Sequence, residues 1–138
     1  YLAGKTLLEI YPQEAVEALL QTYQSEAHND YGAHFHVVKL LGLLQHQPSY
    51  DLIVEALHNT SPQFQKSRAA AAIALGNLQA IPAIPLLKQT LDTPIFDLKY
   101  ACLLALEQLG ENCWSEVVDD QNLLIKAKAN YKLNSNVQ

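Results

Sequence analysis

The sequence of 138 residues has no methionine, only two cysteines, a single arginine and no long hydrophobic run. Two cysteines are too few for the disulfide framework of a small secreted protein, so we predict a reducing, cytoplasmic location. No apolar stretch reaches the roughly 18 residues that a membrane-spanning helix requires, and no signal peptide opens the sequence. Because methionine is missing even at position 1, we expect a processed product or a fragment of a longer chain.

Positive charge is also scarce. Nine Lys and Arg residues against fourteen Asp and Glu residues give a net charge of −5. A protein that binds the nucleic-acid backbone carries a basic stripe, so nucleic acid is excluded as the expected partner. Hydrophobic residues make up 49% of the chain and charged residues 17%, a composition that excludes a disordered chain and favours one globular domain.

Residues that perform chemistry are sparse too. On a helix, the side chains of His34 and His36 point about 200° apart, so one metal ion cannot easily bind both. Cys102 lies among alanine and leucine and is expected in the core, whereas Cys113, beside Trp114 after the helix end, could be exposed. No glycine-rich phosphate loop and no serine-nucleophile elbow is present. We therefore predict no catalytic residue, no metal site and no cofactor.

What the sequence does contain is an internal repeat. The pair Leu41-Gly42 recurs as Leu75-Gly76 and as Leu109-Gly110, so two steps of 34 residues hold three of the five glycines in one register. Apolar residues between these pairs follow helical rather than alternating spacing, which predicts two helices in each unit and no strand. Each second helix is expected to end at its glycine. The predicted pairs are 12–23 with 31–41, 49–59 with 63–75, and 82–91 with 96–109.

These units predict one all-α domain, an α-solenoid of about three helix pairs at 12–47, 48–81 and 82–112, preceded by a partial helix at 1–11. The second helices are expected to share a packing face made of Phe35, Val38, Leu41, Ala69, Ala72, Leu75, Leu103, Leu106 and Leu109. A cap at 113–133 should begin its helix at Asp119-Asp120 and cover the last apolar face. That capping helix carries Leu123, Leu124, Ala127 and Tyr131, and a frayed tail is expected at 134–138.

The middle unit carries a motif that resembles a known family. It reads Arg68-Ala69-Ala70-Ala71-Ala72-Ile73-Ala74-Leu75-Gly76-Asn77-Leu78, followed by Ala80-Ile81-Pro82-Ala83. This motif resembles the HEAT-like repeat of the phycobilisome lyase type, although Ser67 stands where that pattern usually has valine. The resemblance implies an α-solenoid that presents its second helices along a concave surface. Proteins with such repeats include bilin lyase subunits, phycobilisome degradation factors and protein-binding adaptors.

The outward side of the second helices is therefore the candidate partner-binding face. By elimination from the packing face, and with the single arginine added, it contains His36, Lys39, Leu43, Lys66, Arg68, Ile73, Asn77, Tyr100, Leu104 and Glu107. Two alternatives stay open at this point. Ile73 and Leu104 are either exposed to a partner or buried by the neighbouring repeat. Arg68 either contacts the partner or donates a hydrogen bond to a loop carbonyl between repeats.

Three functions fit this face. The first is a non-catalytic scaffold that holds another protein, a phycobiliprotein being one candidate, in phycobilisome assembly or turnover. The second, implied by the resemblance, is a subunit or fragment of a bilin lyase that handles an open-chain tetrapyrrole, with Tyr100, His36 and Arg68 as pocket residues and Arg68 facing a propionate. The third is a purely structural segment of a larger solenoid.

Overall fold

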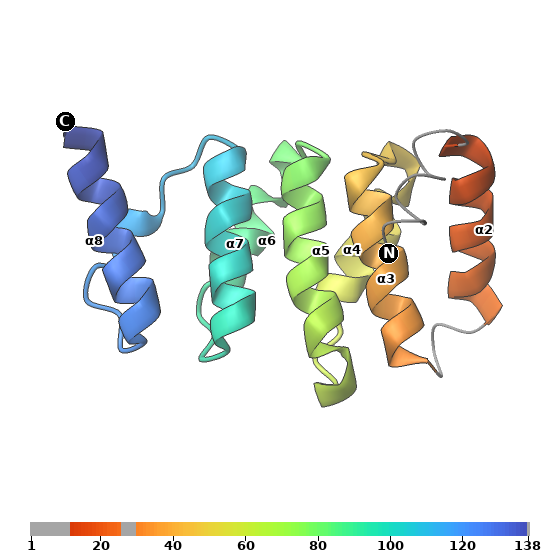
Figure 1. Ribbon diagram of the computed structural model, residues 1–138, viewed down its shortest axis with the longest axis horizontal. Helices are drawn as coiled ribbons and strands as arrows, with labels where there is room; N and C mark the ends of the chain where they lie inside the picture. Colours follow the sequence, from red (N-terminus) through yellow and green to blue (C-terminus); the bar gives the residue numbers. More distant parts are fainter. Residues whose placement is uncertain (1–11, 26–29, 138) are drawn as a thin grey trace.

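The computed structural model describes residues 12–25 and 30–137 of the chain. Every regular element within those ranges is helical, which confirms the predicted all-α solenoid. The partial helix predicted at 1–11 lies outside the described residues. The helices stand side by side in an extended row, with α2 (Pro12–Ser25) at one end and α8 (Leu123–Val137) at the other (Figure 1).

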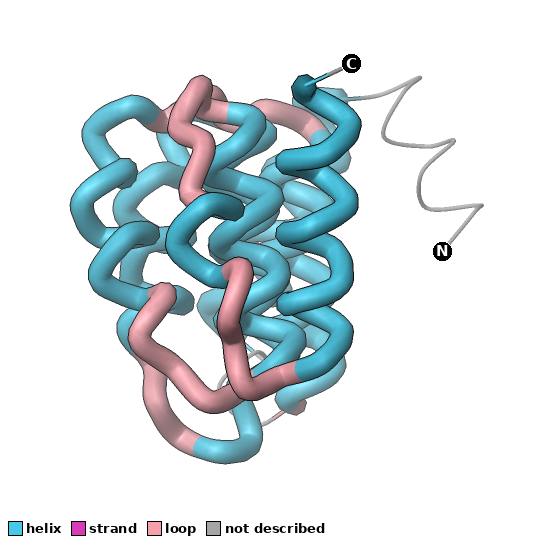
Figure 2. The backbone as a smooth tube through the Cα atoms, turned by 90° about the vertical axis from the view of Figure 1, so that its left-hand side faces the viewer, coloured by secondary structure: helices cyan, strands magenta, loops and turns pink. Residues whose placement is uncertain are grey.

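The row is two layers deep in its middle part. The second helices of the pairs are α3 (Tyr31–Leu43), α5 (Gln65–Asn77) and α7 (Phe96–Gln108). The first helices α4 (Tyr50–His58) and α6 (Ile84–Thr90) lie behind them (Figure 1). Turned by 90°, the same chain shows the two layers as two neighbouring columns of helices (Figure 2).

Short 3-10 turns lead into these helices. The turns η1 (Gln47–Ser49), η2 (Pro62–Phe64) and η3 (Ile81–Ala83) each have a proline in their first two positions. Proline suits the first turn of a helix because its φ is already fixed and it lacks the N–H that would be left unpaired. A fourth turn, η4 (Trp114–Val117), has no proline, and no first helix follows it before α8 begins.

Gly42 and Gly76 lie inside their helices, so the prediction that both end a helix was wrong. A Cβ atom on Gly42 would stand 2.5 Å from the Cβ of Ala74, and one on Gly76 would stand 3.0 Å from the Cα of Ala105. Both distances are shorter than ordinary contacts of a Cβ atom, so a side chain at either position would push the neighbouring helix away. The two glycines therefore mark the points where α3 meets α5 and α5 meets α7.

The left-handed residues that end these helices are Gln45, with φ of 53°, and Gln79, with φ of 54°. Gly110 takes the same role after α7, with φ of 90°. All three helix ends have the hydrogen bonds of a Schellman motif, in which the second residue beyond the C-cap donates to a carbonyl five residues back. These bonds join His46 to Leu41, Ala80 to Leu75, and Glu111 to Leu106.

The predicted packing face forms the core of the second-helix layer. Its members Val38, Leu41, Ala72, Leu75, Leu103 and Leu106 are buried, while Phe35, Ala69 and Leu109 are half-buried against them. Small residues occupy the places where neighbouring second helices meet. Among them, Ala71, Ala74 and Ala105 are each at most 1% exposed. The close approach of the backbones therefore buries a continuous core along the row.

The C-terminal helix differs from the prediction in both its ends and its packing face. It begins at Leu123 and continues to Val137, so residues 134–137 are helical rather than frayed. Ile125 and Ala129 are its fully buried residues. The predicted packing residues Leu123, Leu124 and Tyr131 are 77%, 67% and 65% exposed, and Ala127 is also exposed.

Local hydrogen bonds explain why the helix begins at Leu123 rather than at Asp119-Asp120. The Asn122 side chain accepts hydrogen bonds from the backbone N–H of Leu124 at 3.0 Å and of Ile125 at 3.2 Å, as an N-cap does. Asp120 accepts from the N–H of Asn122 and pairs with Lys99, so it precedes the helix. None of the described helices is both long and apolar enough to cross a membrane.

Candidate binding groove

A groove of about 380 Å³ runs between α3 and α5. Five of the ten predicted partner-binding residues line it: Lys39, Leu43, Lys66, Ile73 and Asn77. The other lining residues are Phe35, Ala69, Ala70, Ala74 and Asp97. The repeat register, which places positions 43 and 77 at equivalent points of adjacent second helices, thus brings this half of the predicted set together.

The groove exists because the two helices approach closely while their side chains are short. Gly42 meets Ala74 at the joint, and Ala70, which is 6% exposed, lies in the floor. Longer side chains stand at the edges, where Leu43 and Ile73 are each 44% exposed. The exposure of Ile73 excludes the alternative that the neighbouring repeat buries it.

The charges around the groove differ in sign from the charge of the whole chain. Lys39 and Lys66 line it together with one carboxylate, that of Asp97, whereas the chain carries a net charge of −5. The ammonium group of Lys39 lies 5.6 Å from the centre of the Phe35 ring. An apolar floor with two ammonium groups beside it suits an apolar ligand that carries carboxylates.

His36 and Arg68 do not line the groove. His36 is exposed, and its ring centre lies 5.1 Å from that of Phe35. Arg68 Nε donates a hydrogen bond to the carbonyl oxygen of Leu57 at 2.9 Å, so Arg68 joins α5 to α4. Arg68 therefore makes a structural hydrogen bond to a carbonyl, which was one of its two predicted alternatives. The carbonyl belongs to α4, the other helix of the same pair, and not to a loop between repeats.

Two predicted residues on α7, Tyr100 and Glu107, belong instead to the joint with α8. The ring of Tyr100 meets that of Trp114 edge-on, with centres 6.0 Å apart. Glu107 accepts a hydrogen bond from Trp114 Nε1 at 2.6 Å and forms an ion pair with Lys132 Nζ at 2.8 Å. Leu104 is half-buried against the core. These contacts attach the C-terminal helix rather than form a second half of the groove.

Two carboxyl groups at that joint have lowered pKa values. Hydrogen bonding to Lys132, and then to Trp114, holds the pKa of Glu107 below its usual range, although burial acts in the opposite direction. Hydrogen bonding to Lys99 lowers the pKa of Asp120 in the same way. Both groups are therefore ionised and paired near neutral pH.

The cysteines are held as thiols. Burial raises the pKa of Cys102 to about 12, as expected for a core residue. Burial and the neighbouring carboxylate of Glu116 also raise the pKa of Cys113. Cys113 is not exposed, since only 3% of it is accessible: the chain turns at Gly110 and packs Cys113 into the core together with Trp114.

The histidines point to different environments. His34 is buried, with its Nδ1 2.7 Å from Ser67 Oγ and its ring between those of Tyr23 and Phe64. His36, two residues later, is exposed. Within residues 12–25 and 30–137, no three histidine, cysteine or carboxylate side chains are grouped so that they could hold a metal ion.

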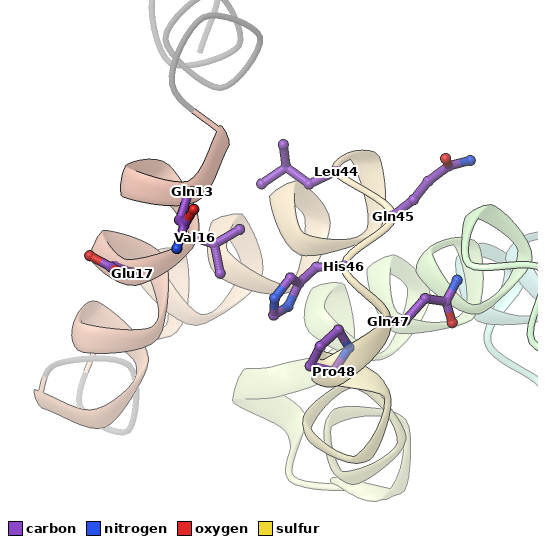
Figure 3. Close-up of a pocket in the computed structure, with 8 residues that line it drawn as sticks. All are labelled: Gln13, Val16, Glu17, Leu44, Gln45, His46, Gln47 and Pro48. Atoms are coloured by element: carbon purple, nitrogen blue, oxygen red, sulfur yellow. The ribbon is translucent and has the colours of Figure 1, made fainter.

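Sequence reasoning missed a second cavity of about 670 Å³ between α2 and the turn after α3. It is lined by Gln13, Val16, Glu17, Leu44, Gln45, His46, Gln47 and Pro48. Figure 3 shows Val16 and His46 facing each other across it, while Gln45 and Gln47 point away. Those two side chains donate hydrogen bonds to carbonyl oxygens of Asn77 and Leu78, at 3.1 and 2.8 Å. Its lining comes from two distant segments with no shared motif, so no signal in the sequence could have revealed it.

Comparison with known proteins finds one matching repeat and two similar proteins. Residues 67–93 match the model of the PBS lyase HEAT-like repeat. The chain is 56% identical over 131 residues to a protein of Pseudanabaena tenuis (strain PCC 7409) named uncharacterized phycocyanin operon protein Y. It is 30% identical over 120 residues to the bilin biosynthesis protein CpeY of Synechococcus sp. (strain WH8020).

These alignments cover 94% and 80% of this chain but only 31% and 27% of the two relatives, so the chain spans about a third of the length of the curated relatives it matches. The matched repeat contains most of α5, the helix that contributes most residues to the groove. The chain is thus built of paired helices, and its residues 67–93 form a HEAT-like repeat of the phycobilisome lyase type.

Proposed function

We propose that the chain is a non-catalytic binding segment, which holds a helix of a phycobiliprotein in the groove between α3 and α5 during phycobilisome assembly or turnover. The observation that carries this proposal is the groove itself, an apolar channel between two rigidly joined helices with exposed Leu43 and Ile73 at its edges. Helices that bind helices present such grooves, in which small floor residues permit close approach.

The charges indicate what the bound helix carries. Lys39 and Lys66 favour carboxylates on either side of an apolar stripe, because complementary charges steer and orient a partner. The relatives' names supply the biological context, since one refers to a phycocyanin operon. No group in the groove is arranged as a nucleophile with a base, so binding without turnover is the function that the groove supports best.

The test is a binding titration with the isolated subunits of phycocyanin. Ile73→Asp places a charge at the edge of the groove, and because Ile73 is 44% exposed the fold should tolerate it. We expect wild-type protein to bind a subunit and Ile73→Asp to lose at least about tenfold in affinity, roughly 1.4 kcal/mol. The matched control is Ile81→Asp, which alters an equally apolar side chain that is 57% exposed on η3, outside the groove.

Binding that Ile73→Asp and Ile81→Asp weaken equally, or leave unchanged, would contradict the proposed site. Circular dichroism should show the same helical content for both variants and for the wild-type protein, which separates lost binding from lost structure. Raising the salt concentration should weaken binding of the wild-type protein, because the two lysines act on solvent-exposed charges.

A second candidate ligand is an open-chain tetrapyrrole. The groove volume of about 380 Å³ lies in the range of small-molecule sites, and two ammonium groups suit a ligand with two propionates. The name of one relative, a bilin biosynthesis protein, favours the same ligand. Tyr100, His36 and Arg68, which the resemblance suggested as pocket residues, do not line this groove.

Biliverdin is a suitable probe for this candidate. If the tetrapyrrole occupies the groove, adding the protein should change the visible absorbance spectrum of biliverdin, and Ile73→Asp should abolish the change while Ile81→Asp preserves it. A spectrum that is unaffected at any protein concentration would count against this ligand and leave the phycobiliprotein helix as the occupant.

A further inference from the structure

The C-terminal helix α8 is apolar on two opposite sides. Ile125 and Ala129 face the core and are fully buried. Leu123, Leu124 and Tyr131 are 77%, 67% and 65% exposed, and with Ala127 between them they cover the opposite side of the helix. A helix that caps a solenoid usually has a polar outer face. The apolar outer face of α8 is instead typical of a helix that packs against a neighbour.

The spacing of the outer residues resembles a helix-packing seam. Leu124, Ala127 and Tyr131 follow one another at intervals of three and four residues, which keeps them in one line along the helix. Ala127 stands in the middle, where a small side chain permits close approach. The same combination of a small central residue and larger neighbours occurs where α3 meets α5 at Gly42.

Lysines border this seam on both sides. Lys126 is exposed on one flank, and Lys128 lies on the other, with its ammonium group 5.5 Å from the centre of the Tyr131 ring. Lys132, one turn further, is already paired with Glu107 and faces α7. The seam is therefore apolar in its centre and positive at its edges, on a chain whose net charge is −5.

These charges argue against a second copy of the chain as the occupant. Two α8 helices packed antiparallel about Ala127 would bring Lys126 against Lys126 and Lys128 against Lys128 of the partner copy. Like charges opposite each other disfavour that arrangement. An occupant with carboxylates at both edges of an apolar stripe would satisfy the same lysines.

We propose that the outward seam of α8, formed by Leu123, Leu124, Ala127 and Tyr131, is a docking surface for an acidic amphipathic helix of a partner polypeptide. The docked helix packs on α8 as a further member of the second-helix row. Its aliphatic residues cover the seam, and its carboxylates pair with Lys126 and Lys128. This surface is separate from the groove between α3 and α5, so it does not depend on the function proposed for that groove.

The test uses two designed peptides of about 21 residues, with leucine at the a and d positions of each heptad. One peptide has glutamate at the e and g positions and the other has lysine. The affinity of each for the whole chain is measured by fluorescence anisotropy of a labelled peptide. We expect the acidic peptide to bind at least about tenfold more tightly than the basic one. Equal affinities, or no binding of either peptide, would overturn the proposal.

Variants of exposed residues locate the binding. Leu124→Asp and Tyr131→Asp should each weaken the acidic peptide at least about tenfold, whereas Ile81→Asp, on η3 outside both the seam and the groove, should leave its affinity unchanged. These affinities are measured in the Ile73→Asp background, which removes binding in the groove. Lys126→Glu should weaken the acidic peptide and strengthen the basic one. A seam with only a structural role would not produce this reversal of preference. A peptide affinity that Leu124→Asp and Tyr131→Asp leave unchanged in that background would contradict the proposal, because it would place the peptide elsewhere on the chain.

Two further measurements address other occupants. Light scattering should show a monomer, and a dimer that Leu124→Asp dissociates would overturn the proposal in favour of a second copy. Co-sedimentation with vesicles of phosphatidylglycerol should show no binding. A basic amphipathic helix can also lie on an anionic membrane, and sedimentation that depends on Leu124 and Lys126, without peptide binding, would replace the helix with a lipid surface.

Discussion

The joints between α3, α5 and α7 differ in construction from the joint between α7 and α8. In the first two, a glycine of one helix meets an alanine of the next, Gly42 with Ala74 and Gly76 with Ala105, and the backbones nearly touch. The last joint is filled by the large side chain of Trp114 and held by ion pairs. The repeated joints require small residues so that the backbones can meet, whereas the terminal joint requires a large side chain to fill the space between the helices.

This difference explains where the candidate groove lies. Close backbone approach between α3 and α5, lined by short alanine side chains, leaves an apolar channel that a ligand can occupy. Between α7 and α8 the corresponding space is taken by Trp114, Tyr100 and the pair of Glu107 with Lys132. Tyr100 and Glu107 of the predicted face are therefore used for attachment, and the five predicted residues that line the groove on α3 and α5 are available for binding.

Removing the large side chain from the terminal joint should have the greatest effect. Trp114 is 1% exposed, so Trp114→Ala leaves a cavity and should lower the free energy of unfolding by about 3–5 kcal/mol. Chemical denaturation followed by circular dichroism measures this loss. Trp114→Phe, which retains most of the volume but removes the hydrogen bond to Glu107, is the control and should lose less. Equal losses would assign the stabilisation to the hydrogen bond instead.

Adding volume to a repeated joint should have the next largest effect. Gly42→Ala places a Cβ 2.5 Å from that of Ala74 and should cost about 1–3 kcal/mol of stability, despite the higher helix propensity of alanine. The double variant with Ala74→Gly exchanges the two small residues and should recover part of the loss, which a double-mutant cycle measures as coupling. Simple additivity of the two changes would contradict a direct contact.

Acidification should open the terminal joint before the repeated joints. The pKa values of Asp120 and Glu107 are lowered in the folded chain, so their contribution is present above the unfolded-state values of about 4 and is lost as the pH falls through the folded values. We expect hydrogen exchange of α8 to accelerate below about pH 4 while α5 remains protected. An Asp120→Asn variant should already show faster exchange of α8 at pH 7. Simultaneous opening of both helices would contradict this order.

The smallest effect is expected at the helix ends. Gln79 has a positive φ, which costs a non-glycine residue about 1 kcal/mol, so Gln79→Gly should stabilise the chain by up to about that amount. Gln45→Gly relieves the same backbone strain but removes the hydrogen bond to the Asn77 carbonyl, so its gain should be smaller or absent. The thermal unfolding midpoints of the two variants and the wild-type protein test this, and the midpoint should rise more for Gln79→Gly than for Gln45→Gly.

The sequence was sufficient for the helical repeat and for part of the site. Helical periodicity and the 34-residue register predicted the pairs, and the same register placed Leu43, Ile73 and Asn77 together at one groove. Periodicity captures these features because every residue at a repeated position meets the same neighbour in the next unit.

Features that depend on a single contact were not predictable in this way. Gly42 and Gly76 were interpreted as helix ends, because glycine favours that position, but the close approach of a neighbouring helix requires glycine just as strictly. The capping helix begins after Asn122 and packs Ile125 and Ala129 inward, which the residue pattern of α8 alone did not reveal. The pairing of Glu107 with Trp114 and Lys132 joins segments outside the repeat register.

The central claim is that the groove between α3 and α5 is the binding surface for a phycobiliprotein helix. Hydrogen–deuterium exchange of the chain with and without phycocyanin subunits tests it most directly. The account predicts that added subunits slow exchange in α3 and α5, around Leu43 and Ile73, and leave α4 and α6 behind them unchanged. Slowed exchange confined to other helices, with α3 and α5 unaffected, would contradict it.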